Sequence, residues 1–196
     1  MDFLARRHWI FDMDGTLTFA AHDFDAFKVE NGMPVDRPIL EVLDEWPAAR
    51  AAAVHTNLRL WEEGIARKSQ AADDAVVLLN ALAKKGHQLG VLTRNTRENA
   101  LLTLKAAGLM AFFEPSVILG RDSAAPKPSP AGVLHILDVW GAHGSDAVMV
   151  GDYLFDIEAG RQAGTATVLI DREAASPPYG HIADRVVTAL SDLLRR

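Results

Sequence analysis

The amino-acid sequence predicts an α/β fold in which a doubly wound parallel sheet carries a small, all-helical insertion. Short apolar runs alternate along the chain with segments of helical periodicity, which is typical of repeated strand–helix units. Residues 147–152 form a nearly unbroken apolar run, as expected for a strand that is buried on both faces. The first two runs, residues 8–12 and 88–93, are separated by a long stretch of helical character. We therefore expect helices inserted after the first strand of the sheet.

The elements follow in order from their apolar patterns and end signals. Strands are expected at residues 8–12, 88–93, 116–120, 147–152, 166–170 and 184–187. Helices are expected at residues 24–27, 36–46, 48–70, 73–86, 96–108, 129–141, 155–163 and 189–195. Asp73 and Asp74 favour the positive end of a helix, and Thr96 and Ser129 are good N-cap residues.

The inserted helices are expected to form a separate cap. Two of them carry apolar stripes, with Ile39, Leu43 and Trp46 on one and Val54, Leu58, Trp61 and Ile65 on the other. We therefore expect a core made of residues 1–20 and 73–196 and a reduced cap made of residues 21–72. Large aromatic side chains are expected inside these units rather than at a substrate; they are Phe24, Trp46, Trp61 and Trp140.

Composition restricts the partners. The chain has 196 residues, a formal net charge of −6 and no cysteine. An acidic chain without basic runs predicts no nucleic-acid partner, and no apolar run is long enough to predict a membrane span. The missing cysteines exclude a disulfide framework, a thiolate metal site and a cysteine nucleophile, and they fit a cytoplasmic protein. We expect a monomer or a weak homodimer.

Polar side chains follow several of the predicted strands. Ligands of doubly wound sheets bind at the carboxyl ends of the strands, and the residues there are Asp12, Asp14, Thr93, Asp152 and Asp156, with Lys127 in the loop before a later strand. Four carboxylates around one point cannot all stay ionised without a counter-charge. A hard divalent cation, most simply Mg²⁺, would supply that charge.

These residues lie in four ordered motifs. They are Asp12-Met13-Asp14-Gly15-Thr16-Leu17, Leu92-Thr93-Arg94-Asn95, Pro126-Lys127-Pro128 and Gly151-Asp152-Tyr153-Leu154-Phe155-Asp156. In this order and chemistry the chain resembles the haloacid dehalogenase (HAD) superfamily of hydrolases, which implies a HAD-like Rossmannoid core. The insertion resembles the C1 cap of the phosphoglycolate phosphatase-like subgroup, although it is shorter than is usual there.

The resemblance implies a role for each motif residue. Asp12 resembles the nucleophile that forms an aspartyl-phosphate, and Asp14 resembles the general acid and base. Thr93 would donate its hydroxyl to a phosphoryl oxygen, and Lys127 would hold Asp12 and the phosphoryl group together. Lys127 could otherwise be an ordinary solvated loop lysine.

The resemblance also implies a metal site and neighbouring substrate contacts. Asp12, Asp152 and the backbone carbonyl of Asp14 would bind Mg²⁺. Asp156 would bind it through water or orient the other ligands, or would simply be a charge at a helix N-terminus. Two residues after Thr93 could contact substrate, or could only shape the turn there; they are Arg94 and Asn95. In the cap, the polar candidates to face the site are His22, His55, Asn57 and Arg59.

The implied function is a Mg²⁺-dependent phosphatase acting on a small phosphorylated metabolite, a phosphomonoester similar to phosphoglycolate. Alternatives within the fold are a pyrophosphatase, a sugar-phosphate phosphatase or mutase, and a binding or regulatory protein with little turnover. Asp14 argues against a dehalogenase, which needs no proton for its leaving group. A receiver module uses similar residues in a different order along the chain.

Overall fold

The computed structural model describes residues 2–173, 176–177 and 179–195. Its centre is a six-stranded, wholly parallel sheet with the strand order β3-β2-β1-β4-β5-β6. The strands are β1 (His8–Phe11), β2 (Gln88–Leu92), β3 (Ile118–Leu119), β4 (Ala147–Gly151), β5 (Ala166–Ile170) and β6 (Arg185–Val187). The order reverses at β1, so the predicted doubly wound α/β fold is confirmed. The switch point, where ligands bind in such sheets, therefore lies between the carboxyl ends of β1 and β4.

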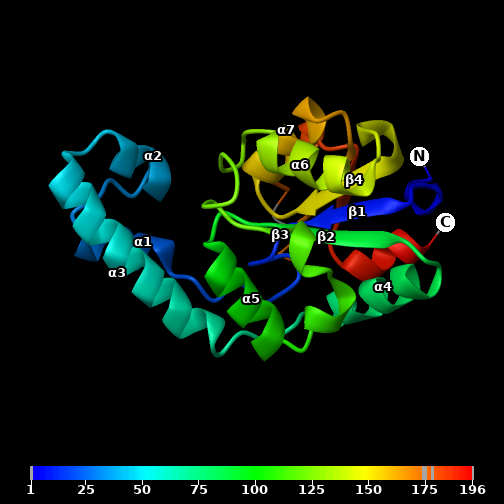
Figure 1. Cartoon of the computed structure of the whole chain (residues 1–196), viewed down its shortest axis with the longest axis horizontal. Coiled ribbons are helices and arrows are strands. Elements are labelled where there is room, and N and C mark those ends of the chain that lie inside the picture. The colour runs from blue at the N-terminus through cyan, green and yellow to red at the C-terminus, as the bar shows by residue number, and fades with distance from the viewer. Residues whose placement is uncertain (1, 174–175, 178, 196) are drawn as a thin grey trace.

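Helices cover both faces of the sheet, as Figure 1 shows. They are α4 (Asp73–Lys84), α5 (Arg97–Ala106), α6 (Ala131–Trp140) and α7 (Leu154–Gln162). Side chains alternate along β1, so Trp9 and Phe11 pack with α4 and α5 while Ile10 packs with α6. All three side chains are fully buried. Burial on both faces explains why the central strands are almost continuously apolar.

The insertion after β1 contains α1 (Phe24–Glu30), α2 (Ile39–Asp44) and α3 (Ala48–Ala66). These helices lie beside the sheet and extend away from it on the side opposite the two chain termini (Figure 1). They have a hydrophobic cluster of their own, in which Phe27, Val42 and Leu58 are buried. An asparagine ends α1, and α2 and α3 each begin directly after a proline, whose fixed φ favours the first turn of a helix.

Several predicted boundaries need correction. The strand expected at 116–120 is only Ile118–Leu119, because Pro115–Val117 forms a 3₁₀ turn that delays the pairing with β2. The helix expected at 189–195 is a 3₁₀ helix, Leu190–Leu194, whose three-residue period places Leu190 and Leu193 on one buried face. Ser129 is not the N-cap of α6; Pro130 occupies that position.

Other end signals behave as predicted. Thr96 caps α5, and its Oγ1 accepts a hydrogen bond from the backbone N–H of Asn99 at 3.3 Å. Asp73 and Asp74 occupy the first turn of α4. Among the described residues, no helix combines the length and the apolar character that crossing a bilayer requires.

Candidate active site

The site begins where β1 ends, at the centre of the sheet. The backbone N–H of Asp12 donates to the carbonyl of Val150 at 2.8 Å, so Asp12 continues the pairing of β1 with β4 and its position is fixed. The chain then turns sharply, and Gly15 has a φ of +86°. A Cβ atom at Gly15 would lie 2.3 Å from Oδ2 of Asp152. Glycine is therefore required both by the backbone and by the approach of Asp152.

An arginine from a distant loop holds this turn in place. Arg172 follows β5, and its guanidinium donates to the carbonyl of Thr16 at 2.8 Å and to that of Gly15 at 3.3 Å. The same guanidinium makes two 2.9 Å hydrogen bonds to the carboxylate of Asp74 in α4. The turn after Asp12 is thereby tied to a helix that packs on the sheet.

Lys127 is the centre of the hydrogen-bond network. Its Nζ donates to Oδ1 of Asp12 at 2.6 Å, to Oδ1 of Asp156 at 2.5 Å and to the carbonyl of Leu92 at 2.7 Å. All three ammonium protons thus have acceptors, which a side chain that is 2% exposed requires. This burial excludes the alternative of a solvated loop lysine. Lys127 joins the ends of β1, β2 and α7 at one point.

Burial controls the ionisation of the carboxyl groups. Burial raises the pKa of Asp12 to about 7, against the opposing effect of Lys127 and with the support of Asp156. Burial also raises the pKa of Asp14 to about 6, assisted by the nearby charge of Glu62. Burial acts to lower the pKa of Lys127, but Asp12 and Asp156 outweigh it and raise that pKa. Asp14 therefore titrates close to neutral pH, where a group can both give and take a proton.

Three of the predicted carboxylates form a group that fits a divalent cation. Asp12, Asp152 and Asp156 each offer an oxygen, and these oxygens lie within 4.8 Å of one another. Burial and the charges of Asp12 and Asp156 raise the pKa of Asp152 well above its ordinary value. Clustered, buried carboxylate oxygens that repel one another are suited to a hard ion such as Mg²⁺. The side chain of Asp14 lies outside this group.

Asp156 has a second role at the start of α7. Its Oδ2 accepts a hydrogen bond from the backbone N–H of Tyr153 at 3.0 Å, while its Oδ1 accepts from Lys127. Gly151 leaves room for this arrangement, because a Cβ there would lie 2.1 Å from Cγ of Asp156. The same carboxylate thus belongs to the acidic group and accepts a hydrogen bond at the N-terminus of α7.

The residues after β2 line the same space. Thr93 is buried, and its Oγ1 accepts from the backbone N–H of Asn95 at 3.1 Å. The Oδ1 of Asn95 accepts from Thr96 N–H at 2.8 Å and from Asn99 Nδ2 at 3.2 Å, so Asn95 does shape the turn. The side chain of Asn95 also acts to lower the pKa of Asp14, against the effect of burial.

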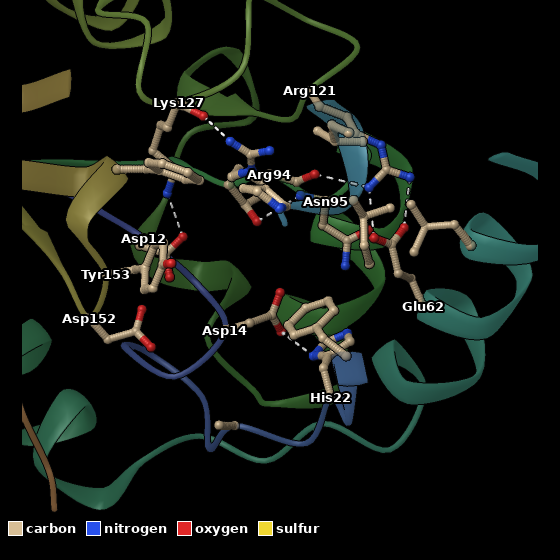
Figure 2. Close-up of a pocket in the computed structure, with 18 of the residues that line it drawn as sticks. Asp12, Asp14, His22, Glu62, Arg94, Asn95, Arg121, Lys127, Asp152 and Tyr153 are labelled. Atoms are coloured by element: carbon tan, nitrogen blue, oxygen red, sulfur yellow. Dashed lines mark hydrogen bonds and ion pairs between the residues drawn. The ribbon is translucent and has the colours of Figure 1, made fainter. Parts of the chain in front are cut away.

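These residues open into a pocket of about 540 Å³ between the sheet and the insertion (Figure 2). Two ion pairs connect its walls. Arg121 makes hydrogen bonds of 2.7 and 2.8 Å to the carboxylate of Glu62 in α3; Glu62 is buried, and the Arg121 side chain is 11% exposed. Arg94 makes two 2.8 Å hydrogen bonds to Glu41 in α2 and also donates to the Lys127 carbonyl. The guanidinium of Arg94 is therefore occupied by groups of the protein.

The arrangement matches a known family. The profile of the haloacid dehalogenase-like hydrolases matches residues 28–170, which is most of the chain. This chain is a haloacid dehalogenase-like hydrolase. The resemblance predicted from the four motifs is confirmed.

Three relatives illustrate the range of similarity within this hydrolase family. Pyrophosphatase PpaX of Bacillus velezensis is 38% identical over 118 residues, a match that covers 59% of this chain and 54% of that protein. Phosphoglycolate phosphatase of Thiobacillus denitrificans is 27% identical over 92% of this chain and 87% of its own. The crystal structure of a HAD phosphatase from Thermococcus onnurineus superposes with a TM-score of 0.70, at 25% identity and 95% coverage of both chains.

Of the four polar residues of the insertion that were predicted to face the site, one lines the pocket. His22 lines it, whereas His55 is exposed, Asn57 bonds to Asn31 at 3.2 Å, and Arg59 lies 3.7 Å from Glu63 as a surface ion pair. Phe24 is a correction, because it is 44% exposed and lines the pocket instead of lying in the core. Phe24 is the first residue of α1, directly after the N-cap Asp23, and its helical spacing with Phe27 alone could not reveal the direction of its side chain.

The sequence patterns missed the ion-pair partners Glu41, Glu62 and Arg121 and the bracing residue Arg172. Glu62 and Glu63 are adjacent acidic residues on one helix, and nothing in their spacing distinguishes the buried Glu62 from the partly exposed Glu63. Their partners lie 59 residues away for Glu62 and four residues away for Glu63. Only the fold reveals the long-range pair.

Stability should depend on pH in the absence of metal. Burial raises the pKa of Asp12 from its ordinary 3.8 to about 7, so the folded chain holds a proton that the unfolded chain has lost between these values. The free energy of unfolding must therefore fall as the pH rises through this range. In chelator, we expect the Tm to decrease from about pH 5 to about pH 8, and we expect Mg²⁺ to reverse the decrease at the upper end.

Thermal unfolding followed by circular dichroism measures this effect. The Asp12→Asn variant removes one titrating carboxyl and should show a shallower decrease than the wild type. A Tm that stays flat or rises with pH in chelator, or that Mg²⁺ fails to raise near pH 8, would contradict the arrangement described.

The two neighbouring glutamates of α3 provide a matched pair of variants. Glu62→Gln leaves the largely buried guanidinium of Arg121 without its charged partner and should cost about 3 kcal/mol of unfolding free energy. Glu63→Gln removes only exposed i, i+4 pairs with Arg59 and Arg67 and should cost less than about 1 kcal/mol. Urea denaturation measures both, and equal losses would show that the Glu62–Arg121 pair does not hold the two walls together.

Proposed function

We propose that this chain is a Mg²⁺-dependent phosphatase that hydrolyses a small phosphomonoester, similar to phosphoglycolate, through an aspartyl-phosphate on Asp12. The observation that carries the proposal is the buried contact of Lys127 with Asp12 inside a group of three carboxylates. A phosphoglycolate phosphatase aligned over 92% of this chain supports the choice of substrate class.

In the first step, an Asp12 oxygen attacks phosphorus and the bond from phosphorus to the ester oxygen breaks. The leaving oxygen takes the proton of Asp14, which is why the pKa of Asp14 must lie near neutrality. Lys127 keeps the Asp12 carboxylate in position and balances its charge as that charge moves to the phosphoryl group. Thr93 would donate its hydroxyl to a phosphoryl oxygen.

In the second step, water attacks the phosphorus of the aspartyl-phosphate. Asp14, now a carboxylate, takes the proton of the water, and the bond between phosphorus and the Asp12 oxygen breaks. Inorganic phosphate is released and both carboxyl groups return to their starting states. The same residue thus serves as acid and then as base, which requires one proton to be stored on Asp14 between turnovers.

Asp12, Asp152 and the Asp14 backbone carbonyl would hold Mg²⁺, with Asp156 as a further ligand through water or as an orienting group. The bound ion would neutralise charge between the carboxylates and the phosphoryl group. We propose that residues 21–72 act as the cap that closes the pocket and that Arg94 and Asn95 contact substrate only after Arg94 leaves Glu41. Cytoplasmic localisation and a monomeric or weakly dimeric state stay predictions.

A pyrophosphatase is the second candidate, because the relative that is 38% identical carries that name. The same residues could attack a phosphoanhydride, whose leaving phosphate needs less help from an acid. A panel of small phosphate esters together with pyrophosphate separates the two activities. A protein of this fold that only binds ligands would turn over none of them.

Asp12→Asn should lower the rate of hydrolysis of an activated aryl phosphate by at least about 1000-fold, because the amide is a poor nucleophile. The control is Asp44→Asn, the same change at an exposed position of α2, which should leave the rate within about twofold. Steady-state assays measure both. A rate in Asp12→Asn above a few per cent of wild type would exclude Asp12 as the nucleophile.

Asp14→Asn should discriminate between substrates by their leaving groups. A poor leaving group such as an alkoxide needs the proton of Asp14, whereas an activated phenolate does not. We expect kcat for an alkyl phosphate to fall at least about 100-fold more than the rate constant of the burst with an aryl phosphate. That burst reports formation of the aspartyl-phosphate. Rapid-quench kinetics separates the two steps, and equal losses in both measurements would remove Asp14 from the role of acid.

A further inference from the structure

His22 is a buried histidine without a hydrogen-bond partner. It lies in the segment that leads from the core into α1, and its side chain is 4% exposed. Neither Nδ1 nor Nε2 of its ring has a hydrogen-bond partner among the described residues. No other described residue of the pocket leaves a buried side-chain nitrogen or oxygen unpaired. Buried polar groups are rarely left in this state, so the ring is suited to receive a ligand.

Aromatic neighbours fix the direction of this ring. The ring of Phe24 stacks on it with a centroid distance of 5.1 Å and an interplanar angle of 7°, and Trp61 meets it edge-on at 5.2 Å. Burial also lowers the pKa of His22, which favours a neutral ring with one N–H donor and one acceptor. The imidazole is thus held rigidly and offers hydrogen bonds without carrying charge.

The ring lies next to Asp14 on the side away from Asp12 (Figure 2). Its Nδ1 is 3.9 Å from Oδ1 of Asp14, which is too long for a hydrogen bond. If Asp14 gives its proton to the ester oxygen, the atoms attached to that oxygen lie between Asp14 and the cap. His22 is a polar group of the pocket wall on that side of Asp14.

We propose that His22 is a specificity-determining residue that hydrogen-bonds an oxygen of the leaving group, carried on the carbon next to the ester carbon. This inference rests on the proposed phosphatase function. Two oxygens on neighbouring carbons are separated by about one hydrogen-bond length, so one can accept from Asp14 while the other contacts His22. A hydroxyl and a carboxylate oxygen share this chemistry.

Three cationic side chains of this wall are already paired. Arg121 is bonded to Glu62, and Arg94 is bonded to Glu41. Lys28 donates to the carbonyl of Val35 at 2.7 Å. A leaving group would have to break one of these contacts to bind there, whereas His22 has no hydrogen bond to give up. His22 can therefore bind the neighbouring oxygen while the ion pairs of this wall stay intact.

Three substrates of nearly equal size test the proposal on the wild-type protein. They are 2-hydroxyethyl phosphate, phosphoglycolate and propyl phosphate, the last of which places a methyl group where the others have oxygen. We expect kcat/KM for at least one oxygen-bearing substrate to exceed that for propyl phosphate about tenfold or more. Preference for the first indicates a hydroxyl, and preference for the second a carboxylate. Equal values for all three overturn the proposal.

Variants at His22 test whether this side chain causes the preference. His22→Phe keeps the aromatic packing but removes both nitrogens, so the preference should fall to about twofold or less. His22→Gln restores a neutral donor and acceptor and should recover most of it. The matched control His55→Phe, at an exposed position of α3, should keep the wild-type preference. An unchanged preference in His22→Phe overturns the proposal, and if this variant fails to fold, the wild-type comparison decides alone.

An activated aryl phosphate separates this inference from the proposed function. If the wild type hydrolyses it in an Asp12-dependent way but treats the three alkyl substrates alike, only the role of His22 is wrong. If the wild type hydrolyses none of the phosphate esters, the phosphatase function fails and the inference fails with it.

Discussion

The buried ammonium group of Lys127 is the interaction on which the rest of the site depends. Carboxylates that follow β1 and β4 are brought within a few ångströms of one another, and such a cluster would be unstable without a positive charge among them. Lys127 supplies that charge with every proton bonded, to Asp12, to Asp156 and to the carbonyl of Leu92. The doubly wound sheet makes the contact available, because its strand order brings the ends of β1, β2 and β4 together.

Electrostatic balance also explains how the inserted helices relate to the core. Glu62 in α3 forms an ion pair with Arg121, which follows β3. Glu41 in α2 forms one with Arg94, which follows β2. Negative charge on the inserted helices is thus balanced by positive charge on the loops of the core. The Glu62 carboxylate at the same time helps to raise the pKa of Asp14. Movement of the insertion would therefore change both the access to the pocket and the affinity of Asp14 for its proton.

The sequence predicted most of the fold and the residues of the core site, but not the contacts between distant segments. Strands such as 147–152 and motif residues such as Asp12 are specified by local pattern, and the parallel sheet then determines where their side chains meet. The apolar pattern predicts a longer β3 than the structure has, because Pro115 begins a 3₁₀ turn that takes up the first residues of the expected strand. The pairing of Glu62 with Arg121 could not be predicted from sequence. Which of the neighbouring residues Glu62 and Glu63 is buried depends on how the inserted helices pack against the core. His22 was one of four equal candidates until the fold separated them.

The stereochemical course at phosphorus tests the central claim most directly. Transfer to Asp12 and then to water involves two in-line displacements, whereas direct attack by water involves one. Hydrolysis of a phosphomonoester made chiral with oxygen isotopes distinguishes them. The mechanism proposed for this hydrolase predicts overall retention of configuration, and overall inversion would contradict a covalent intermediate on Asp12.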